Sequence, residues 1–445
     1  MPDADVPWQR LQRPVPTWFT EAGLGIFIHW GAYSVPAWGE PVGELGTVDD
    51  ATWFQHNPYA EWYWNTIRLS GSPASQRHRE MYGDATYDDF LDSWTASQFD
   101  AADWLSLFAR AGARYVVPTT KHHDGIALWD APGTGTRNTV RRGPRRDLVG
   151  ELAAATREAG LRFGVYYSGG LDWSVTDLPP IRTQPDVVGL RPRDAAYAAY
   201  AALQVRDLID RYRPDMLWND IEWPDAGKHD GELGLFQLFE QYYATVPEGV
   251  VNDRWGETHW DFRTSEYQHG LANESAAAWE NCRGIGLSFG YNQAEDEAHS
   301  LDGPGVVRHL VDVVSRGGNL LLNVGPTADG RIPDVQRWAL EGLAGWMQVN
   351  AAAVHGVRPV EDGLAAAGAD PWVRWTTREG ELWAACEGTG RLLLPADPSR
   401  LDLGSARLAD GTPVAAERAD GGVVVDLPVP AVPGPAVVRF TRAGT

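Results

Sequence analysis

Short apolar runs alternate with helical patterns through the first three quarters of the chain. Four of these runs predict buried strands, because they are continuous, apolar and rich in β-branched or aromatic residues. They span residues 24–30, 115–119, 163–167 and 216–218. Helices are predicted over residues 101–111 and 147–158, where apolar side chains share one face and a glycine follows as a stop signal. Strand and helix therefore alternate as βα units, which is typical of an α/β protein with a parallel sheet.

The same alternation continues to about residue 355. Further strands are predicted over residues 250–252, 264–267, 286–289 and 319–324. Helices predicted over residues 306–315 and 335–349 flank the last of these strands. About eight βα units fit into the roughly 350 residues available, although the fifth and sixth are irregular. The pattern predicts a (β/α)8-like barrel.

After residue 355 the pattern changes to short alternating runs separated by Gly, Pro and Asp turns. The runs cover residues 382–386, 391–394 and 422–425. Residues 362–370 are predicted to form a loop. This pattern of short alternating runs is typical of a small antiparallel β-sandwich. The predicted organisation is therefore a barrel domain over residues 1–355, followed by a C-terminal β-sandwich over residues 356–445.

Charge and composition narrow the classes of partner. The 445 residues carry a net charge of -22, which repels phosphate backbones and anionic lipids. We therefore expect no nucleic-acid and no membrane partner, and no segment offers about 18 uninterrupted apolar residues. Cys282 and Cys386 lie far apart and are expected to be reduced core thiols. The first residues lack a signal-peptide pattern, so a cytoplasmic location is expected.

Aromatic residues are abundant, with 21 Trp and 15 Tyr. Their rings stack against apolar C–H surfaces, while the indole N–H and the phenol O–H reach hydroxyl groups. A sugar offers both kinds of surface. Carbohydrate is therefore a candidate ligand, beside the simpler explanation that these rings fill a large core.

Residues 121–125, with the sequence KHHDG, follow directly on the strand predicted at 115–119. They place two imidazoles at the carboxyl end of a strand, where α/β barrels keep their active sites. Adjacent strand residues point to opposite faces, so His122 and His123 are not expected to share a metal ion. Imidazole suits hydrogen bonding to hydroxyl groups, because one nitrogen donates while the other accepts. Either histidine could equally be structural.

Two carboxyl groups are usually needed to hydrolyse a glycosidic bond, one at the anomeric carbon and one to protonate the leaving oxygen. Asp220 follows a predicted strand between two tryptophans, and Glu222 is its rival. Three glutamates beside aromatic residues qualify as the acid, because desolvation favours a protonated carboxyl group. They are Glu61, Glu266 and Glu280. Each could equally be the salt-bridge partner of an arginine.

Six short motifs occur in order over nearly 270 residues. They are GIFIHWG at 25–31, EWY at 61–63, KHHDG at 121–125, LWND at 217–220, NDRW at 252–255 and RGIGLSFGYN at 283–292. Together they resemble the motifs of the α-L-fucosidases of glycoside hydrolase family 29. The later stretch NLLLNVGP, at 319–326, is similar to the closing strand of that family.

The resemblance implies an exo-acting, retaining hydrolase that removes terminal α-L-fucose through a covalent fucosyl-enzyme. It also implies a (β/α)8-like barrel followed by a β-sandwich, with no metal and no cofactor. The substrate would be a fucosylated oligosaccharide or glycoconjugate, and a homo-oligomer stays open. Another retaining exo-glycosidase and a catalytically silent sugar-binding barrel are the alternatives, because a fold alone does not fix the sugar or the chemistry.

Position by position, the resemblance implies that Asp220 is the nucleophile and Glu266 the general acid/base, with Glu61 and Glu280 as alternatives for the acid. An apolar wall of Trp218 and Phe289 would suit the methyl group of a 6-deoxy sugar. Contacts with or near the sugar hydroxyls are implied for His29, Glu61, Trp62, His122, His123, Tyr167 and Arg254.

Overall fold

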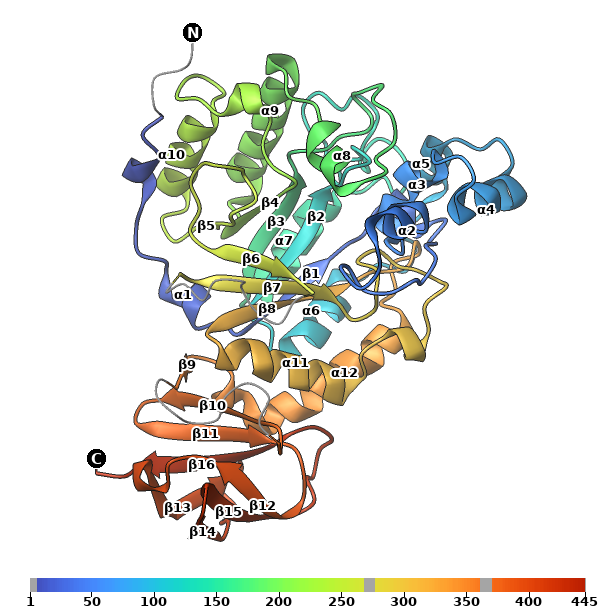
Figure 1. Cartoon of the computed structure of the whole chain (residues 1–445). Coiled ribbons are helices and arrows are strands. Elements are labelled where there is room, and N and C mark those ends of the chain that lie inside the picture. The colour runs from blue at the N-terminus through green and yellow to red at the C-terminus, as the bar shows by residue number, and fades with distance from the viewer. Residues whose placement is uncertain (1–5, 268–276, 361–369, 445) are drawn as a thin grey trace.

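An eight-stranded parallel sheet curls on itself and forms the body of the molecule (Figure 1). The structure is a computed structural model that describes residues 6–267, 277–360 and 370–444. The strands are β1 (Leu24–Ile28), β2 (Tyr115–Lys121), β3 (Arg162–Ser168), β4 (Met216–Asp220), β5 (Val250–Val251), β6 (Arg263–Glu266), β7 (Trp279–Gly284) and β8 (Gly318–Val324). Their order is β5-β4-β3-β2-β1-β8-β7-β6, so the first strand pairs with the last. The predicted (β/α)8-like barrel is confirmed.

Helices cover the outer face of this sheet. The main ones are α6 (Ala101–Arg110), α7 (Leu148–Glu158), α9 (Ala195–Tyr212), α10 (Leu235–Thr245), α11 (Gly303–Ser315) and α12 (Asp334–Asn350). Four of them follow an aspartate whose side chain accepts N–H bonds from the first turn, which satisfies donors that a helix start leaves unpaired. The shorter helices are α1 (Thr17–Thr20), α2 (Asp50–Gln55), α3 (Tyr63–Ile67), α4 (Pro73–Tyr82), α5 (Tyr87–Ser93) and α8 (Gln184–Gly189).

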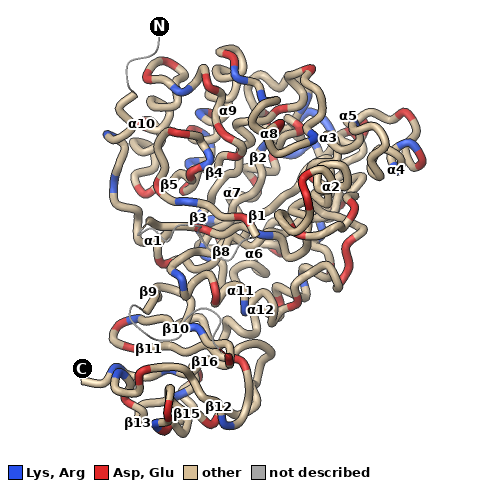
Figure 2. The backbone as a smooth tube through the Cα atoms, in the orientation of Figure 1, with Lys and Arg blue, Asp and Glu red and all other residues tan. Residues whose placement is uncertain are grey.

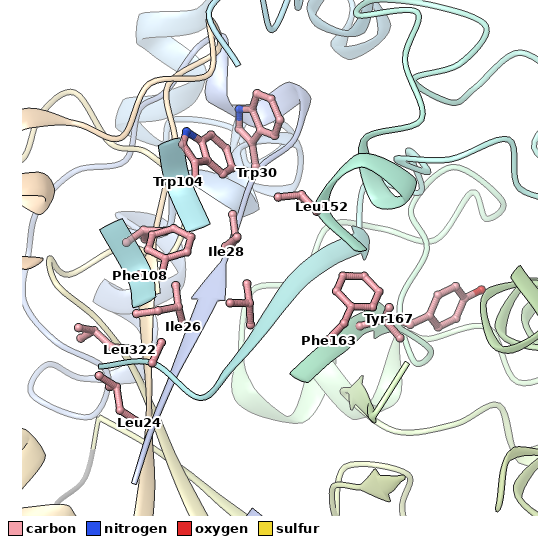
Figure 3. Close-up of a cluster of buried hydrophobic side chains, with 14 of the residues drawn as sticks. Leu24, Ile26, Ile28, Trp30, Trp104, Phe108, Leu152, Phe163, Tyr167 and Leu322 are labelled. Carbon is pink, nitrogen blue, oxygen red and sulfur yellow. The ribbon is translucent and has the colours of Figure 1, made fainter. Parts of the chain in front are cut away.

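Side chains of β1 alternate between two apolar cores. Ile26 and Ile28 of β1 pack with Trp104 and Phe108 of α6 in the core between sheet and helices (Figure 3). The intervening Phe27 belongs to a second core, inside the barrel. Because successive strand residues face opposite sides, a shift of one position decides whether a side chain supports the fold or reaches the barrel interior.

The seventh strand does not lie where the apolar pattern predicts it. β7 covers Trp279–Gly284, and the predicted strand at 286–289 is wrong, because those residues form a loop beyond the end of β7. The sequence of β7 includes the fully buried Glu280 and Asn281. A strand that buries polar groups in a barrel shows no apolar run, so the hydrophobic pattern misses it.

The barrel has a seam between β5 and β6, which do not pair with each other within residues 250–266, all of which are described. Asp261 bridges this seam. Its amide donates to the carbonyl of Val251 (2.9 Å), and its carboxylate accepts the amide of Val251 (2.8 Å). One buried carboxylate therefore replaces part of the missing strand ladder.

A smaller β-domain follows the barrel. Its two antiparallel sheets have the orders β13-β16-β11-β10-β9 and β12-β15-β14. The strands are β9 (Arg358–Pro359), β10 (Val373–Arg378), β11 (Glu381–Cys386), β12 (Gly390–Pro395), β13 (Leu401–Leu408), β14 (Ala416–Ala419), β15 (Gly422–Leu427) and β16 (Ala436–Arg442). Leu382 and Val425 meet in a core between the sheets, which confirms the predicted β-sandwich. The loop predicted at 362–370 lies, apart from Asp370, outside the described residues.

Helices α11 and α12 lie between the barrel sheet and the β-domain (Figure 1). Trp346 of α12 donates its indole N–H to the carbonyl of Pro435 (2.9 Å), and Arg374 of β10 pairs with Asp312 of α11. These contacts tie the two parts of the chain together. Both cysteines are free and buried, as the sequence predicts.

Charges of both signs are distributed over the whole molecule. Figure 2 shows Lys and Arg interspersed with Asp and Glu along the barrel and the β-domain alike. Within the part of the chain that the structure describes, no helix combines the length and the apolar character needed to span a membrane.

We predict that Asp261→Ala weakens the barrel at its seam. The change leaves the amide of Val251 without its side-chain partner. It also removes one of two partners of the Tyr243 hydroxyl, which donates to the same carboxylate at 2.8 Å and lies 2.7 Å from His259 Nε2. A buried donor left unpaired costs about 1–3 kcal/mol, so the free energy of unfolding should fall by about 1–3 kcal/mol. Urea denaturation followed by tryptophan fluorescence measures this change.

Glu240→Ala is the matched control, because Glu240 forms an exposed ion pair with Arg10 at 3.3 Å. It should change the free energy of unfolding by less than about 0.5 kcal/mol. Equal effects of the two substitutions would contradict the role assigned to Asp261.

Candidate active site

A cavity of about 180 Å³ opens at the carboxyl ends of the barrel strands, where such barrels place their active sites. It is lined by ten of the eleven residues to which the sequence assigns a site role. They are His29, Glu61, Trp62, His122, His123, Trp218, Asp220, Arg254, Glu266 and Phe289. The fold thus brings together side chains from all six motifs, with Glu266 in addition.

A larger hollow of about 640 Å³ lies at the opposite, amino-terminal ends of the strands, against the β-domain. Its arginines are mostly paired, as Arg162 is with Asp215 and Arg358 with Glu21. The amino-terminal face of a barrel usually serves stability. The cavity at the carboxyl ends is therefore the candidate active site.

Asp220, the last residue of β4, is held by donors on both carboxylate oxygens. Its Oδ1 accepts Arg254 Nη1 (2.9 Å) and the amide of Ile221 (2.9 Å), and its Oδ2 accepts the hydroxyl of Tyr166 (2.8 Å). Burial opposes the charged form, but the charge of Arg254 and these hydrogen bonds outweigh it, so the pKa of Asp220 lies below its usual value. Asp220 is therefore an ionised, oriented carboxylate.

Glu266, at the end of β6, shares Arg254 with Asp220. Its Oε2 accepts Arg254 Nη2 (3.0 Å), and its Oε1 accepts the hydroxyl of Tyr59 (2.9 Å). The guanidinium itself is fixed by a bond from Nε to Thr264 Oγ1 (3.1 Å) and lies over the ring of Trp218. One planar cation therefore sets the relative positions of the two carboxylates.

Hydrogen bonds fix the tautomers of two imidazoles in the cavity. His29 Nδ1 lies 2.7 Å from Asn323 Oδ1, which can only accept, so the proton is on Nδ1. His123 Nδ1 lies 2.6 Å from Ser168 Oγ, whose own proton goes to the carbonyl of Leu171. Burial lowers the pKa of His29 to about 3 and that of His123 to about 4, so both rings are neutral. Each leaves its Nε2 as an acceptor.

His122 and His123 both line the cavity, because β2 ends at Lys121 and the chain turns at these two residues. The ring of His122 stacks on that of Tyr166, with an interplanar angle of 13°. Burial lowers the pKa of His122, and its Nδ1 is buried without a hydrogen-bond partner. Among the described residues, no group of three or more His, Cys, Asp or Glu side chains is arranged to hold a metal ion.

A buried ion pair supports the histidine loop from behind. Lys121 Nζ bonds to Asp172 Oδ2 at 2.8 Å, and both side chains have 0% exposure. The amide of Trp173 donates to the carbonyl of His123 (2.8 Å). Gly125 is required beside this pair, because it has a φ of +71° and a Cβ there would lie 2.2 Å from Asp172 Oδ1. Lys121 and Gly125 of the KHHDG motif therefore help to hold the two histidines between them in place.

The assignment of Tyr167 to the site is wrong. Tyr167 packs in the outer core (Figure 3). Its hydroxyl donates to Gln204 Oε1 (2.8 Å). Its neighbour Tyr166 faces the barrel interior and bonds to Asp220. β3 is buried on both faces, so its apolar run contains no sign of which tyrosine points inward.

The structure separates the rival carboxylates. Glu61 lines the cavity and accepts the amide of Gly290 (2.7 Å), and burial raises its pKa to about 7. Glu280 does not line the cavity, and it accepts the Tyr115 hydroxyl and the Trp218 indole inside the barrel. Glu222 also lies off the cavity, with its carboxylate paired to two cations. Glu280 and Glu222 are therefore poor candidates for contact with a substrate.

Two functional residues escape the sequence reasoning. Tyr166 is missed because the sequence assigns its neighbour Tyr167 to the site. Tyr59 donates to Glu266, yet the only signal was its place two residues before the EWY motif. An ionised, oriented carboxylate opposite a second one, in a cavity with neutral hydrogen-bonding rings, has the parts needed to cleave a glycosidic bond.

Comparison with known proteins adds evidence of a different kind, on the family of the chain. The family model described as Alpha-L-fucosidase matches residues 3–352. Tissue alpha-L-fucosidase of Macaca fascicularis is 32% identical over 391 residues, which cover 86% of this chain and 75% of that protein. Two solved structures of Thermotoga maritima alpha-fucosidase, in complex with fucose and with a mechanism-based inhibitor, are each 43% identical. Their TM-scores are 0.86 and 0.87, and the matches cover 98% of this chain and 98% and 99% of those chains.

We predict that Glu280→Gln changes the pH dependence of stability. Burial raises the pKa of Glu280 from its ordinary 4.5 to about 7, so between these values the folded protein holds a proton that the unfolded chain releases. Wild-type stability from this group is present below 4.5 and falls by about 1.4 kcal/mol per pH unit as the pH rises towards 7. Glutamine cannot ionise. The stability advantage of the wild type should therefore shrink over this window, as measured by urea denaturation at several pH values.

Glu257→Gln, an exposed control, should give a difference from the wild type that does not change with pH. A constant difference for Glu280→Gln as well would show that Glu280 titrates alike in the folded and unfolded chains.

Proposed function

The chain belongs to the α-L-fucosidase family of glycoside hydrolases, and from this premise we propose that it is an exo-acting, retaining enzyme that works through a covalent fucosyl-enzyme. The observation that carries the proposal is the pairing of Asp220 and Glu266 with the single guanidinium of Arg254. Its substrate would be a fucosylated oligosaccharide or glycoconjugate. The relative from Thermotoga maritima that was solved with fucose supports this choice of sugar.

Asp220 suits the role of nucleophile. Retaining glycosidases place the two carboxyl groups about 5–5.5 Å apart, whereas inverting enzymes need about 6.5–9.5 Å to admit a water. A guanidinium shared by Asp220 and Glu266 favours the shorter separation. The relative solved with a mechanism-based inhibitor also supports a covalent step.

The reaction would proceed in two displacements. An oxygen of Asp220 attacks the anomeric carbon while Glu266 protonates the departing aglycone oxygen. Esterification removes the charge of Asp220, so Arg254 then pairs with Glu266 alone, and an ionised Glu266 is what the second step needs. Glu266 accepts a proton from water as that water attacks the anomeric carbon. Fucose leaves and the Asp220 carboxylate is restored.

Neutral side chains would recognise the sugar. The Nε2 acceptors of His29 and His123 suit hydroxyl donors, and that of His123 lies 3.7 Å from Asp220 Oδ2. The unpartnered Nδ1 of His122 is a buried polar atom that a hydroxyl group would satisfy. Trp218 and Phe289 offer an apolar wall for the C6 methyl group. The small volume of the cavity favours one terminal sugar over an internal one.

We predict that Asp220→Gly abolishes hydrolysis of an aryl α-L-fucoside, with kcat reduced at least about a thousandfold. The glycine leaves space for azide, which should attack the same carbon and restore turnover as fucosyl azide. Release of nitrophenol and isolation of the azide product measure this.

Asp230→Gly is the matched control, since Asp230 is exposed and belongs to none of the motifs. It should keep wild-type activity and show no response to azide. Hydrolysis by Asp220→Gly at the wild-type rate without azide would rule out the nucleophile.

We predict that Glu266→Ala affects substrates according to their leaving group. kcat/KM reports the first displacement, which needs an acid only when the aglycone is a poor leaving group. An α-L-fucosyl disaccharide should therefore lose at least about a hundredfold more kcat/KM than 2-chloro-4-nitrophenyl α-L-fucoside.

Glu61→Ala and Glu280→Ala serve as comparisons, and both should slow the two substrates by similar factors. Uniform slowing by Glu266→Ala, together with leaving-group dependence in Glu61→Ala, would transfer the role of the acid to Glu61.

A further inference from the structure

Two strained residues follow Asp220 directly. Ile221 has a φ of 65° and Glu222 a φ of 122°, both in the region that L-residues avoid. A β-branched residue with positive φ is an outlier, because its Cβ crowds the backbone. Such conformations persist only where the surroundings hold them, and they concentrate at functional sites.

The strained backbone of Ile221 and Glu222 directs an amide donor at Asp220. The amide of Ile221 donates to Asp220 Oδ1 at 2.9 Å, on the same oxygen that accepts Arg254. With Tyr166 on Oδ2, this bond leaves the Asp220 carboxylate no freedom to rotate. The side chain of Ile221 lines the cavity beside it.

Glu222 is held at both its main chain and its side chain. Asn219 Nδ2 donates to the carbonyl of Glu222 at 3.0 Å. The carboxylate of Glu222 pairs with Arg191 Nη2 at 2.9 Å and with Lys228. The Arg191 side chain is 3% exposed, so one of these cations is fixed in the protein interior.

Two glycines make room for this arrangement. A Cβ on Gly256 would lie 2.3 Å from Glu222 Oε1, and a Cβ on Gly170 would lie 2.9 Å from the carbonyl carbon of Ile221. Both sites come from neighbouring loops, after β5 and β3. The surroundings are therefore built to admit the strained step and its ion pairs.

We propose that Glu222 is a positioning residue. Its pairing with Arg191 and Lys228 holds the strained backbone of Ile221 and Glu222 and thereby orients the Asp220 carboxylate. The inference rests on the proposed role of Asp220 as nucleophile. Glu222 itself contacts no substrate, because it does not line the cavity. It acts by keeping the amide of Ile221 on Asp220 Oδ1.

Alanine and glycine at position 222 separate strain from charge, because they differ by one methyl group and both lack the carboxylate. Glu222→Ala keeps a Cβ at a φ of 122° but lacks the carboxylate that pairs with Arg191 and Lys228. The backbone of residues 221 and 222 should therefore relax, and the Asp220 carboxylate should lose its orientation. We expect kcat/KM for an aryl α-L-fucoside to fall about tenfold to a hundredfold. Glu222→Gly adopts this φ without steric cost and should stay within about fivefold of the wild type.

The inhibition constant of fucose should change by less than about twofold in both variants, because binding does not depend on the exact aim of one carboxylate oxygen. Circular dichroism and the melting temperature of each variant identify any loss that comes from unfolding. Asp225→Asn is the control, since Asp225 contacts Arg191 (2.6 Å) and Lys228 (3.3 Å) but has no strained backbone role. It should keep kcat/KM within about twofold of the wild type.

Equal losses in Glu222→Ala and Glu222→Gly, or wild-type activity in Glu222→Ala, would overturn the proposal. The azide experiment on Asp220→Gly keeps the two ideas apart. If Asp220→Gly is inactive and rescued while the position 222 variants behave alike, only the positioning role fails. If Asp220→Gly hydrolyses like the wild type, the proposed function fails first.

Discussion

The guanidinium of Arg254 is the contact on which the cavity depends. It lies between two carboxylates on different strands, Asp220 at the end of β4 and Glu266 at the end of β6. Without a cation there, two buried negative charges would repel each other and one would take up a proton. Because the fork of an arginine donates in one plane, it also fixes the direction from which each carboxylate faces the cavity. Charge balance and geometry are thus set by one side chain.

The seam of the barrel is what allows Arg254 to occupy this place. β5 is only two residues long, and its ladder does not extend to β6 within the described segment between them. The chain leaves the sheet early, so Arg254 can reach across to Glu266 while Asn252 bonds to the backbone of Asn219 on β4 (3.0 Å). The irregular βα unit that begins with β5 therefore supplies the arginine that bridges the two carboxylates. Asp261 compensates for the lost ladder at the other end of the seam.

The sequence predicts most of this fold because periodicity and turn residues are local signals, as the regular helices α6, α7, α11 and α12 show. It fails where burial on both sides removes the period, as with Tyr166 and Tyr167 in β3, and where a strand buries charge, as in β7. Ten of the eleven residues that the sequence assigns to the site line the cavity, because most of them stand in short motifs at or near the ends of strands. The link from Tyr59 to Glu266 spans 207 residues, and no pattern in one sequence reports a contact of that kind.

Burial of the imidazoles completes the electrostatic design. The transition state of glycoside cleavage resembles an oxocarbenium ion, so positive charge develops on the sugar. A protonated histidine in the cavity would oppose that charge, but burial keeps His29 and His123 neutral far below neutral pH. The two neutral rings can then orient hydroxyl groups without adding positive charge to the cavity. The ionised Asp220 faces the positive charge that develops on the sugar. Arg254 carries the positive charge that pairs with both acidic groups, and the ionised Asp220 supplies the negative charge that faces the sugar.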